Sequence, residues 1–193
     1  MKTRRGASAL ALIGGLIVIL GIAAAMTFSY TNGFVTMDEQ VKARWAQVDN
    51  QLKRRADLVP NLVATVKGYA SHETEVFAKI AEARAKLAGG GTPAEKIQAN
   101  GELTTGLNRL IAVAEAANPD LKSAPLFRQL MDELAGTENR LSVERMRYNE
   151  AVQELNTAMR RLPGSLFAGA SGVKPATYFE VSATEKETPK VAF

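Results

Sequence analysis

Hydrophobic residues recur in steps of three and four along most of the chain after residue 33, with polar residues between them. This spacing places them on one face of a helix, and one seven-residue frame accommodates them all, as in a coiled-coil-like seam. The pattern predicts a first long helix over residues 35–88, which ends at three consecutive glycines because glycine commonly follows a helix C-terminus. The residues in this frame are Val41, Trp45, Val48, Leu52, Val59, Leu62, Val66, Tyr69, Val76, Ile80, Ala83 and Leu87.

Two further helices follow the glycines. Thr92, Pro93 and Glu95 supply an N-cap hydroxyl, a proline at the first helical position and a capping-box glutamate, so we expect a second helix over residues 93–117. A third run of periodic hydrophobic residues begins at residues 123–125 and closes at Pro163, unless Gly136 divides it. No strand pattern of any length appears, residues 178–182 being the only candidate, and residues 164–193 predict an irregular tail pinned to the helices by aromatic side chains.

An uncharged segment precedes the periodic part of the chain. No side chain over residues 6–30 is charged at neutral pH, and about 20 such residues suffice for a helix to cross the hydrocarbon core. The alternative is a cleaved signal peptide, for which Ala23, Ala24 and Ala25 match the small-residue cleavage pattern. This apolar run is longer than the roughly 7 to 15 residues usual in signal peptides, which favours a retained transmembrane anchor.

The charges beside this segment predict its orientation. Cations precede it and acids are the first charges after it, so the positive-inside rule keeps residues 1–5 in the cytoplasm and places the body outside. These flanking residues are Lys2, Arg4 and Arg5 on one side, and Asp38 and Glu39 on the other. Three of the 24 cations belong to this flank, and the remaining 21 nearly balance the 20 acids of the chain. The basic pI of about 9.4 therefore indicates the membrane orientation and no nucleic-acid partner.

These elements predict an all-α protein with an N-terminal transmembrane helix over residues 6–30. A long-helix antiparallel bundle, four-helix-bundle-like and with coiled-coil character, follows over residues 31–163, and the irregular tail over residues 164–193 packs on it. At 1.5 Å per residue the first bundle helix reaches ~80 Å, whereas the second returns only ~37 Å. A membrane-proximal stalk, residues 35–58, therefore has no guaranteed partner within the chain. The seam of this stalk predicts a homo-oligomer interface, unless the third helix or the tail covers it. The seam consists of Val41, Trp45, Val48 and Leu52.

A proline interrupts the first predicted helix. Pro60 cannot donate to the carbonyl of Ala56 and crowds it, so the helix is expected to kink or restart there. Asp57 and Asn61 flank the break with short side chains that can bond freed backbone amides. These three positions predict a hinge between the stalk and the bundle.

Several polar residues are candidates for interactions. Arg55 and Glu73 occupy seam positions, where each needs an opposite charge or water, and Glu144 is a candidate partner for Arg55. Such residues can set register and oligomeric state, or they can form a binding site. Lys53, Arg54 and Arg55 form a cationic patch, either a solvated face or a contact for acidic headgroups. A stripe of Ser142, Asn149 and Asn156 recurs every seven residues and can form hydrogen bonds between helices.

The residues for enzymatic chemistry are mostly missing. The chain has no cysteine and one histidine, His72, and Val76 stands where the second histidine of a zinc-protease HExxH motif would be. His72 is therefore expected to be a surface or capping residue rather than a metal ligand or a pH switch. We predict no catalytic residues, no metal site and no cofactor.

The pattern W..VD.QLKRR.DL.PNLV..VKGYA.HE over residues 45–73, together with residues farther along the chain, resembles the signature of the bacterial LemA family. The resemblance implies a single-pass membrane protein with a four-helix-bundle-like body and no enzymatic activity. It also implies that the protein is associated with membrane organisation, membrane stress responses or membrane proteases, as members of this family are. Leu162 and Val173 depart from the aromatic residues expected of the family. The matching residues are Trp45, Val48, Asp49, Gln51, Leu52, Lys53, Arg54, Arg55, Asp57, Leu58, Pro60, Asn61, Leu62, Val63, Val66, Lys67, Gly68, Tyr69, Ala70, His72, Glu73, Ala83, Arg84, Arg147, Tyr148, Asn149, Asn156, Pro163, Tyr178, Phe179, Glu180, Pro189, Val191 and Phe193.

The sequence thus predicts a non-enzymatic, membrane-anchored scaffold or adaptor of the bacterial cytoplasmic membrane. Self-assembly through the stalk is the first hypothesis, with the lipid bilayer and like chains as partners. The second is a sensor or adaptor subunit for a membrane protease or another envelope protein. The third is an unrecognised hydrolase or metal enzyme, for which His72 would be the best residue.

Overall fold

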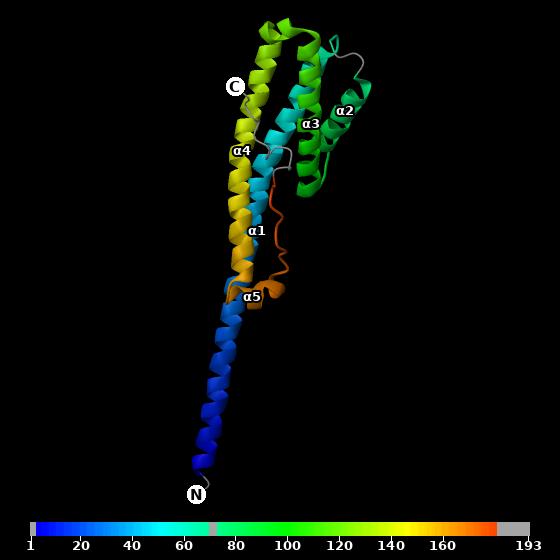
Figure 1. Ribbon diagram of the computed structural model, residues 1–193. Helices are drawn as coiled ribbons and strands as arrows, with labels where there is room; N and C mark the ends of the chain where they lie inside the picture. Colours follow the sequence, from blue (N-terminus) through cyan, green and yellow to red (C-terminus); the bar gives the residue numbers. More distant parts are fainter. Residues whose placement is uncertain (1–2, 70–72, 181–193) are drawn as a thin grey trace, which may run out of the picture. The chain divides into compact units, whose positions relative to one another are not determined.

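The computed structural model describes residues 3–69 and 73–180, with side chains described from Leu12 onward, and these residues contain helices but no strand. The α-helices are α1 (Thr3–Val66), α2 (Thr74–Ala88), α3 (Pro93–Ala117), α4 (Pro125–Arg160) and α5 (Gly164–Phe167). Two short 3₁₀ helices, η1 (Pro119–Ser123) and η2 (Ala168–Ser171), follow α3 and α5 (Figure 1). The predicted all-α class is confirmed.

The chain divides into two compact units. The anchor unit consists of Met1–Val41 and Ala151–Ala176, and the body unit consists of Lys42–Glu150 and Thr177–Phe193. Helices α1 and α4 each contribute one part to each unit. Each unit has its own core, and the two are described separately below.

The body unit is a bundle of four helical segments. Helices α2 and α3 form an antiparallel hairpin, while Trp45 contacts Tyr148 and Arg55 contacts Glu138, so α1 and α4 also run antiparallel (Figure 1). The core side chains share one face of each segment and include Val48, Leu52, Val59, Leu62, Val66, Val76, Ile80, Leu87, Leu103, Leu107, Leu110, Phe127, Leu130, Leu141 and Tyr148.

The hairpin has two local causes. Thr92 accepts a hydrogen bond from the amide of Glu95, whose carboxylate accepts from the amide of Thr92, so the predicted capping box forms. Within the hairpin, a Cβ at Gly106 would lie only 2.8 Å from Cγ1 of Ile80. The missing side chain of Gly106 therefore allows α2 and α3 to approach closely.

The prediction of one helix over residues 35–88 is wrong. Helix α1 begins at Thr3, passes residues 31–33 without a break and ends at Val66, and α2 begins only at Thr74. Residues 67–69 form a turn in which the amide of Tyr69 donates to the carbonyl of Val66 at 2.9 Å. Gly68 lowers helix propensity there, and Tyr69, expected on the seam, is exposed. The length argument for an uncovered stalk loses its basis, because the helix that was to reach ~80 Å ends 22 residues earlier.

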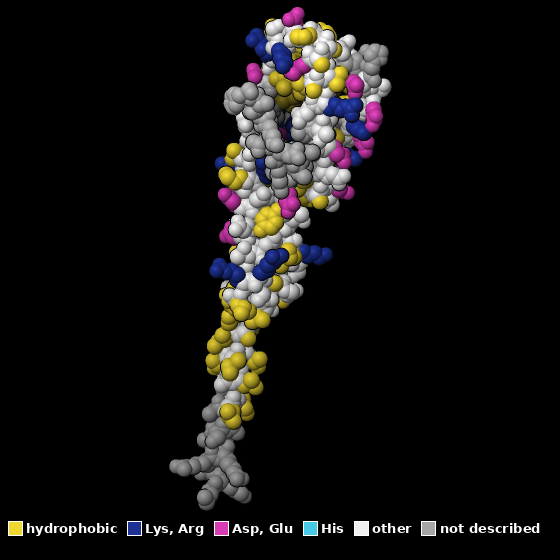
Figure 2. All heavy atoms as spheres, in the orientation of Figure 1, with side chains coloured by type: hydrophobic (Ala, Val, Ile, Leu, Met, Phe, Trp, Pro, Cys, Tyr) yellow, Lys and Arg dark blue, Asp and Glu magenta, His cyan; other side chains and the backbone are white. Residues whose placement is uncertain are grey.

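The anchor unit contains the one described helix that is long and apolar enough to cross a membrane. Exposed hydrophobic side chains cover its described part, among them Leu16, Leu20 and Phe28 (Figure 2). At the end of this apolar part, Tyr30 stacks on Phe167 with ring centroids 5.2 Å apart. Phe34 is only 2% exposed, so it belongs to the core of this unit rather than to its surface. The apolar part of α1, which is long enough to cross a membrane, is therefore packed against α5 at its end.

Candidate interaction site

A buried arginine joins three helices of the body unit. Arg55 on α1 is 7% exposed, donates to Oδ1 of Asn100 on α3 at 2.8 Å, and forms an ion pair of 2.8 Å with Glu138 on α4. A buried guanidinium group needs such partners because its desolvation is otherwise costly. The prediction that Glu144 pairs with Arg55 is wrong, since Glu144 accepts a hydrogen bond from Arg147 at 2.8 Å on the same helix.

A second buried ion pair lies nearby in the same unit. Lys96 on α3 pairs with Asp49 on α1, and Asp49 also pairs with Lys53 at 2.8 Å. Burial raises the pKa of Asp49, but hydrogen bonds and charge from Lys53 and Lys96 together outweigh it and lower the pKa below its usual value. Asp49 is therefore held as a carboxylate. Its ion pair with Lys96 and the hydrogen bond of Arg55 to Asn100 together fix the register of α1 against α3.

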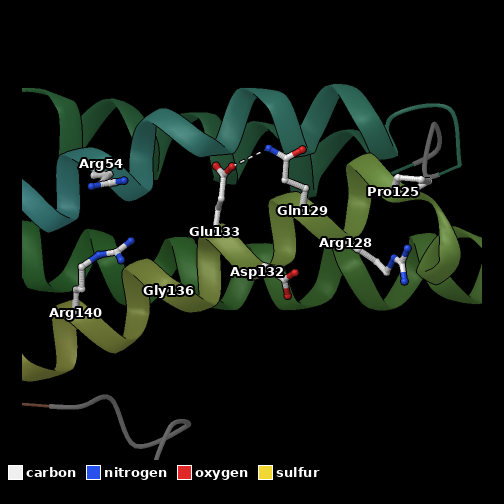
Figure 3. Close-up of a pocket in the computed structure, with 8 residues that line it drawn as sticks. All are labelled: Arg54, Pro125, Arg128, Gln129, Asp132, Glu133, Gly136 and Arg140. Carbon is white, nitrogen blue, oxygen red and sulfur yellow. Dashed lines mark hydrogen bonds between the residues drawn. The ribbon is translucent and has the colours of Figure 1, made fainter.

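An open groove of about 640 Å³ lies on the surface of the body unit between α1 and the first half of α4 (Figure 3). Arg54 comes from α1, one position before the buried Arg55, and its side chain faces that of Arg140 across the groove. Gly136 lies one turn before Arg140 on α4, where a Cβ would lie 3.5 Å from the Arg140 guanidinium (Figure 3). The groove is lined by Arg54, Pro125, Arg128, Gln129, Asp132, Glu133, Gly136 and Arg140.

The arginines of this groove carry free charge. Among the described residues, no hydrogen bond or ion pair engages the side chains of Arg54, Arg128 or Arg140. Of the two acids, Glu133 accepts a hydrogen bond from Gln129 at 3.0 Å. A guanidinium group is always charged and binds a carboxylate or phosphate through two parallel hydrogen bonds. The groove is thus suited to a ligand with negative charges near the arginines and none next to Asp132 and Glu133 in the middle of the groove.

The predicted oligomer seam is covered by the chain itself. In the body unit Val48 and Leu52 are fully buried, and the ring of Trp45 packs edge-on against Tyr148 at 5.4 Å. In the anchor unit Val41 is buried as well. The premise that these residues lack partners within the chain is therefore wrong, and the alternative, burial by other parts of the same chain, is what the structure shows.

The proline of the predicted hinge lies inside a continuous helix, so a restart at Pro60 is wrong. Its missing amide frees the carbonyl of Ala56, and this carbonyl accepts a hydrogen bond from Nε of Arg84 on α2 at 3.0 Å. Asp57 is exposed, and Asn61 accepts a hydrogen bond from Thr65 through its own carbonyl. Arg84 thus braces the position where a hinge was expected, and movement there stays a prediction.

The two asparagines of the predicted polar stripe, Asn149 and Asn156, bind the C-terminal segment rather than a helix. In the body unit, Asn149 donates to the carbonyl of Phe179 at 3.0 Å and accepts from its amide at 2.8 Å. In the anchor unit, Asn156 does the same with Ala176, at 2.9 Å in both directions. Each carboxamide thus replaces the neighbouring strand that an extended residue would have in a sheet. We call these two interactions the asparagine clasps.

The two remaining candidates are His72 and Glu73. His72 lies outside the described residues. Glu73 is the residue before α2, and its carboxylate lies 3.4 Å from the guanidinium of Arg109 on α3. Glu73 is therefore a partly exposed ion-pair residue at a helix start rather than a buried acid on a seam.

These features define a membrane-associated helical-bundle protein with an arginine-lined groove. The sequence profile of the LemA family matches residues 44–193. The chain belongs to the LemA family, and the family resemblance found in the sequence is confirmed.

The chain is also similar to magnetosome proteins. MamQ 1 and MamQ 2 of Paramagnetospirillum magneticum strain AMB-1 are each 27% identical to it over 175 residues. MamQ of Magnetospirillum gryphiswaldense strain MSR-1 is 26% identical over 174 residues. Each match covers 77% of this chain and 64% of the relative, so the chain spans less than two thirds of these relatives. Neither the family description nor these names state an enzymatic activity.

Proposed function

We propose that this protein is a non-enzymatic, membrane-anchored adaptor whose arginine-lined groove binds an extended acidic segment of a partner protein. The observation that carries the proposal is the groove of Figure 3, in which Arg54, Arg128 and Arg140 are exposed without an acidic partner among the described residues. Isolated arginines on a protein surface are common, but three that line one groove provide a defined spacing of charge.

The spacing indicates the shape of the ligand. Arg128 and Arg140 are twelve residues apart on α4, which corresponds to about 18 Å along the helix. An extended peptide covers this distance in five or six residues at about 3.3 Å each. Asp132 and Glu133 lie between the two arginines, so a basic or polar residue fits the middle of the peptide. These acids also disfavour a continuous polyanion such as nucleic acid.

The first experiment measures peptide binding by the full chain in detergent or nanodiscs. The probe is a fluorescent seven-residue peptide with glutamates at both ends, lysine in the middle and serines between. The double variant Arg54→Gln, Arg140→Gln should weaken binding at least ~10-fold, since each charged contact contributes on the order of 1.5 kcal/mol or more. Lys79→Gln, Lys122→Gln is the matched control, because it removes the same charge from exposed lysines outside the groove.

Two outcomes refute the adaptor proposal. The first is an equal loss of affinity in the double variant and in its charge-matched control, which would mean non-specific attraction. The second is equal binding of a peptide in which both glutamates are replaced by glutamine. Affinity capture from solubilised membranes then tests for a natural partner, which should be recovered with the wild-type chain and lost with the double variant.

The second candidate function is a self-assembling scaffold linked to membrane organisation or envelope stress. Its support is in the anchor, where space is open within 4 Å around Gly15 and Gly21, so another helix can approach closely. Recovery of chiefly the chain itself in the capture experiment favours this function. In both cases we propose a bacterial cytoplasmic membrane location with the N-terminus inside, supported by Lys2, Arg4 and Arg5 before the anchor.

A further inference from the structure

The end of the membrane anchor carries a second apolar feature in the same unit. Phe167 of α5 stacks on Tyr30 with the two rings tilted by only 7°. A Cβ at Gly164 would lie 3.2 Å from the Phe34 ring and 2.3 Å from the carbonyl oxygen of Ala158. The chain therefore returns to the anchor helix here and fits closely against it, with Gly164 required for the approach.

Two leucines of this returning segment point away from the protein. Leu162 is 77% exposed and Leu166 is 72% exposed, although both lie within a few residues of the packed Gly164 and Phe167. Tyr30, on which Phe167 stacks, lies at the end of the anchor predicted over residues 6–30 and is followed by the polar residues Thr31 and Asn32. Its amphipathic ring therefore marks where the anchor leaves the hydrocarbon core. The segment over residues 162–167 is thereby placed at the depth of the membrane–water interface.

Basic residues accompany the two leucines. Arg160, Arg161 and Lys174 are exposed, and no described residue forms an ion pair or side-chain hydrogen bond with them. Over residues 151–176 the only acid is Glu154. Exposed leucines beside unpaired cations are typical of segments that lie in the interface and contact anionic lipid headgroups. The same composition would be unfavourable if the surface faced only water.

We infer that residues 160–167, together with Lys174, form a second membrane contact, which we call the membrane foot. Leu162 and Leu166 insert into the leaflet from which the anchor emerges, and the three cations bind phosphates of its anionic phospholipids. A single helix can rotate and tilt about its axis in a bilayer, whereas a helix with a foot attached to its side is restricted. The inference depends on the membrane anchor and is independent of the arginine-lined groove.

The absence of cysteine makes the test direct. A single cysteine replaces Leu166, carries an environment-sensitive fluorophore, and is placed in the full chain reconstituted in phosphatidylcholine vesicles with about 30% phosphatidylglycerol. Leu162→Cys provides a second position, and Leu126→Cys is the matched control, because Leu126 is an exposed leucine of the body unit. Quenching is measured with lipids spin-labelled near the headgroup end of the acyl chain, and with aqueous iodide.

Probes at Leu162 and Leu166 should be quenched by the spin-labelled lipid and shielded from iodide at least several-fold relative to the probe at Leu126. Iodide quenching equal to that of Leu126 at both positions would overturn the inference. The triple variant Arg160→Gln, Arg161→Gln, Lys174→Gln should reduce the lipid quenching, as should vesicles without phosphatidylglycerol. If neither change has an effect, the proposed phosphate contacts are wrong and only the insertion of the leucines stands.

Discussion

The clasp at Asn156 allows a sharp test of how the C-terminal segment is held. Its carboxamide donates to the carbonyl of Ala176 and accepts from the amide of the same residue, both at 2.9 Å. Replacement of Asn156 by aspartate conserves size and shape and keeps the acceptor, but removes the donor. A carboxylate oxygen then faces the carbonyl oxygen of Ala176, so one hydrogen bond is lost and a repulsion is added.

The expected magnitude follows from these two changes. A lost hydrogen bond contributes about 1 kcal/mol, and an unsatisfied, part-buried carbonyl adds about 1 kcal/mol more. A total of about 2 kcal/mol corresponds to a roughly 30-fold increase in local opening. Hydrogen exchange at the Ala176 amide measures this directly in the full chain.

The pH dependence of Asn156→Asp provides a second readout. At acidic pH the new carboxyl group is protonated and can again donate a hydrogen bond to the carbonyl of Ala176. The lost hydrogen bond can therefore form again as the pH falls. Protection of Ala176 in the variant should recover on acidification, relative to the wild-type chain at the same pH.

The matched control is Gln153→Glu, which makes the same chemical change at an exposed position on the same helix. It should leave exchange at Ala176 within a factor of two. Wild-type protection of Ala176 in Asn156→Asp at neutral pH would refute the reasoning, because it would mean that packing, not the paired hydrogen bonds, holds the segment.

Three further predictions concern the bundle and the anchor. Arg55→Ala should lower the free energy of unfolding by about 2 to 3 kcal/mol, measured by denaturant titration, because Glu138 is left without its partner. In Asp49→Asn the loss of folding stability in acid should be smaller than in the wild-type chain. The lowered folded-state pKa of Asp49 stabilises the wild-type fold above the unfolded-state pKa of this group, and this stabilisation is lost as the pH falls through the folded-state pKa. Gly164→Ala should speed trypsin cleavage just before α5, because its Cβ would overlap the Ala158 carbonyl.

Each of these has a matched control. Lys79→Ala removes an exposed ion pair, that of Lys79 with Glu75, and should leave the free energy of unfolding nearly unchanged. Glu75→Gln removes another carboxylate of lowered pKa, but an exposed one, and should leave the acid transition nearly unchanged. Gly101→Ala adds a Cβ where nothing lies within 4 Å, so cleavage near α5 should stay at the wild-type rate. Equal effects in a variant and its control would contradict the corresponding structural explanation.

The local signals in the sequence were sufficient for much of the fold. The uncharged run over residues 6–30 indicates a membrane anchor, because length and lack of charge are properties of the segment alone. Thr92, Pro93 and Glu95 mark the start of α3, because caps are formed by residues a few positions apart. Periodicity likewise indicated the helical run of α4, but it left open whether Gly136 divides it, and the structure shows one continuous helix.

The tertiary structure decided what depends on residues far apart in the chain. The seven-residue pattern continues across residues 67–73, so only the three-dimensional packing of α2 on α3 shows that α1 has ended at Val66. The carbonyl freed by Pro60 is bound by Arg84, which is 28 residues beyond Ala56.

The groove and the asparagine clasps have the same origin. Arg54 and Arg140 share a groove only because α1 and α4 run antiparallel in the body unit. Spacing identified Asn149 and Asn156 as a polar stripe, but their ligands are backbone groups, which carry no signal in the sequence. Periodicity therefore determined the helices and the anchor, whereas the interactions between distant segments required the folded chain, because amide and carbonyl groups are alike at every position.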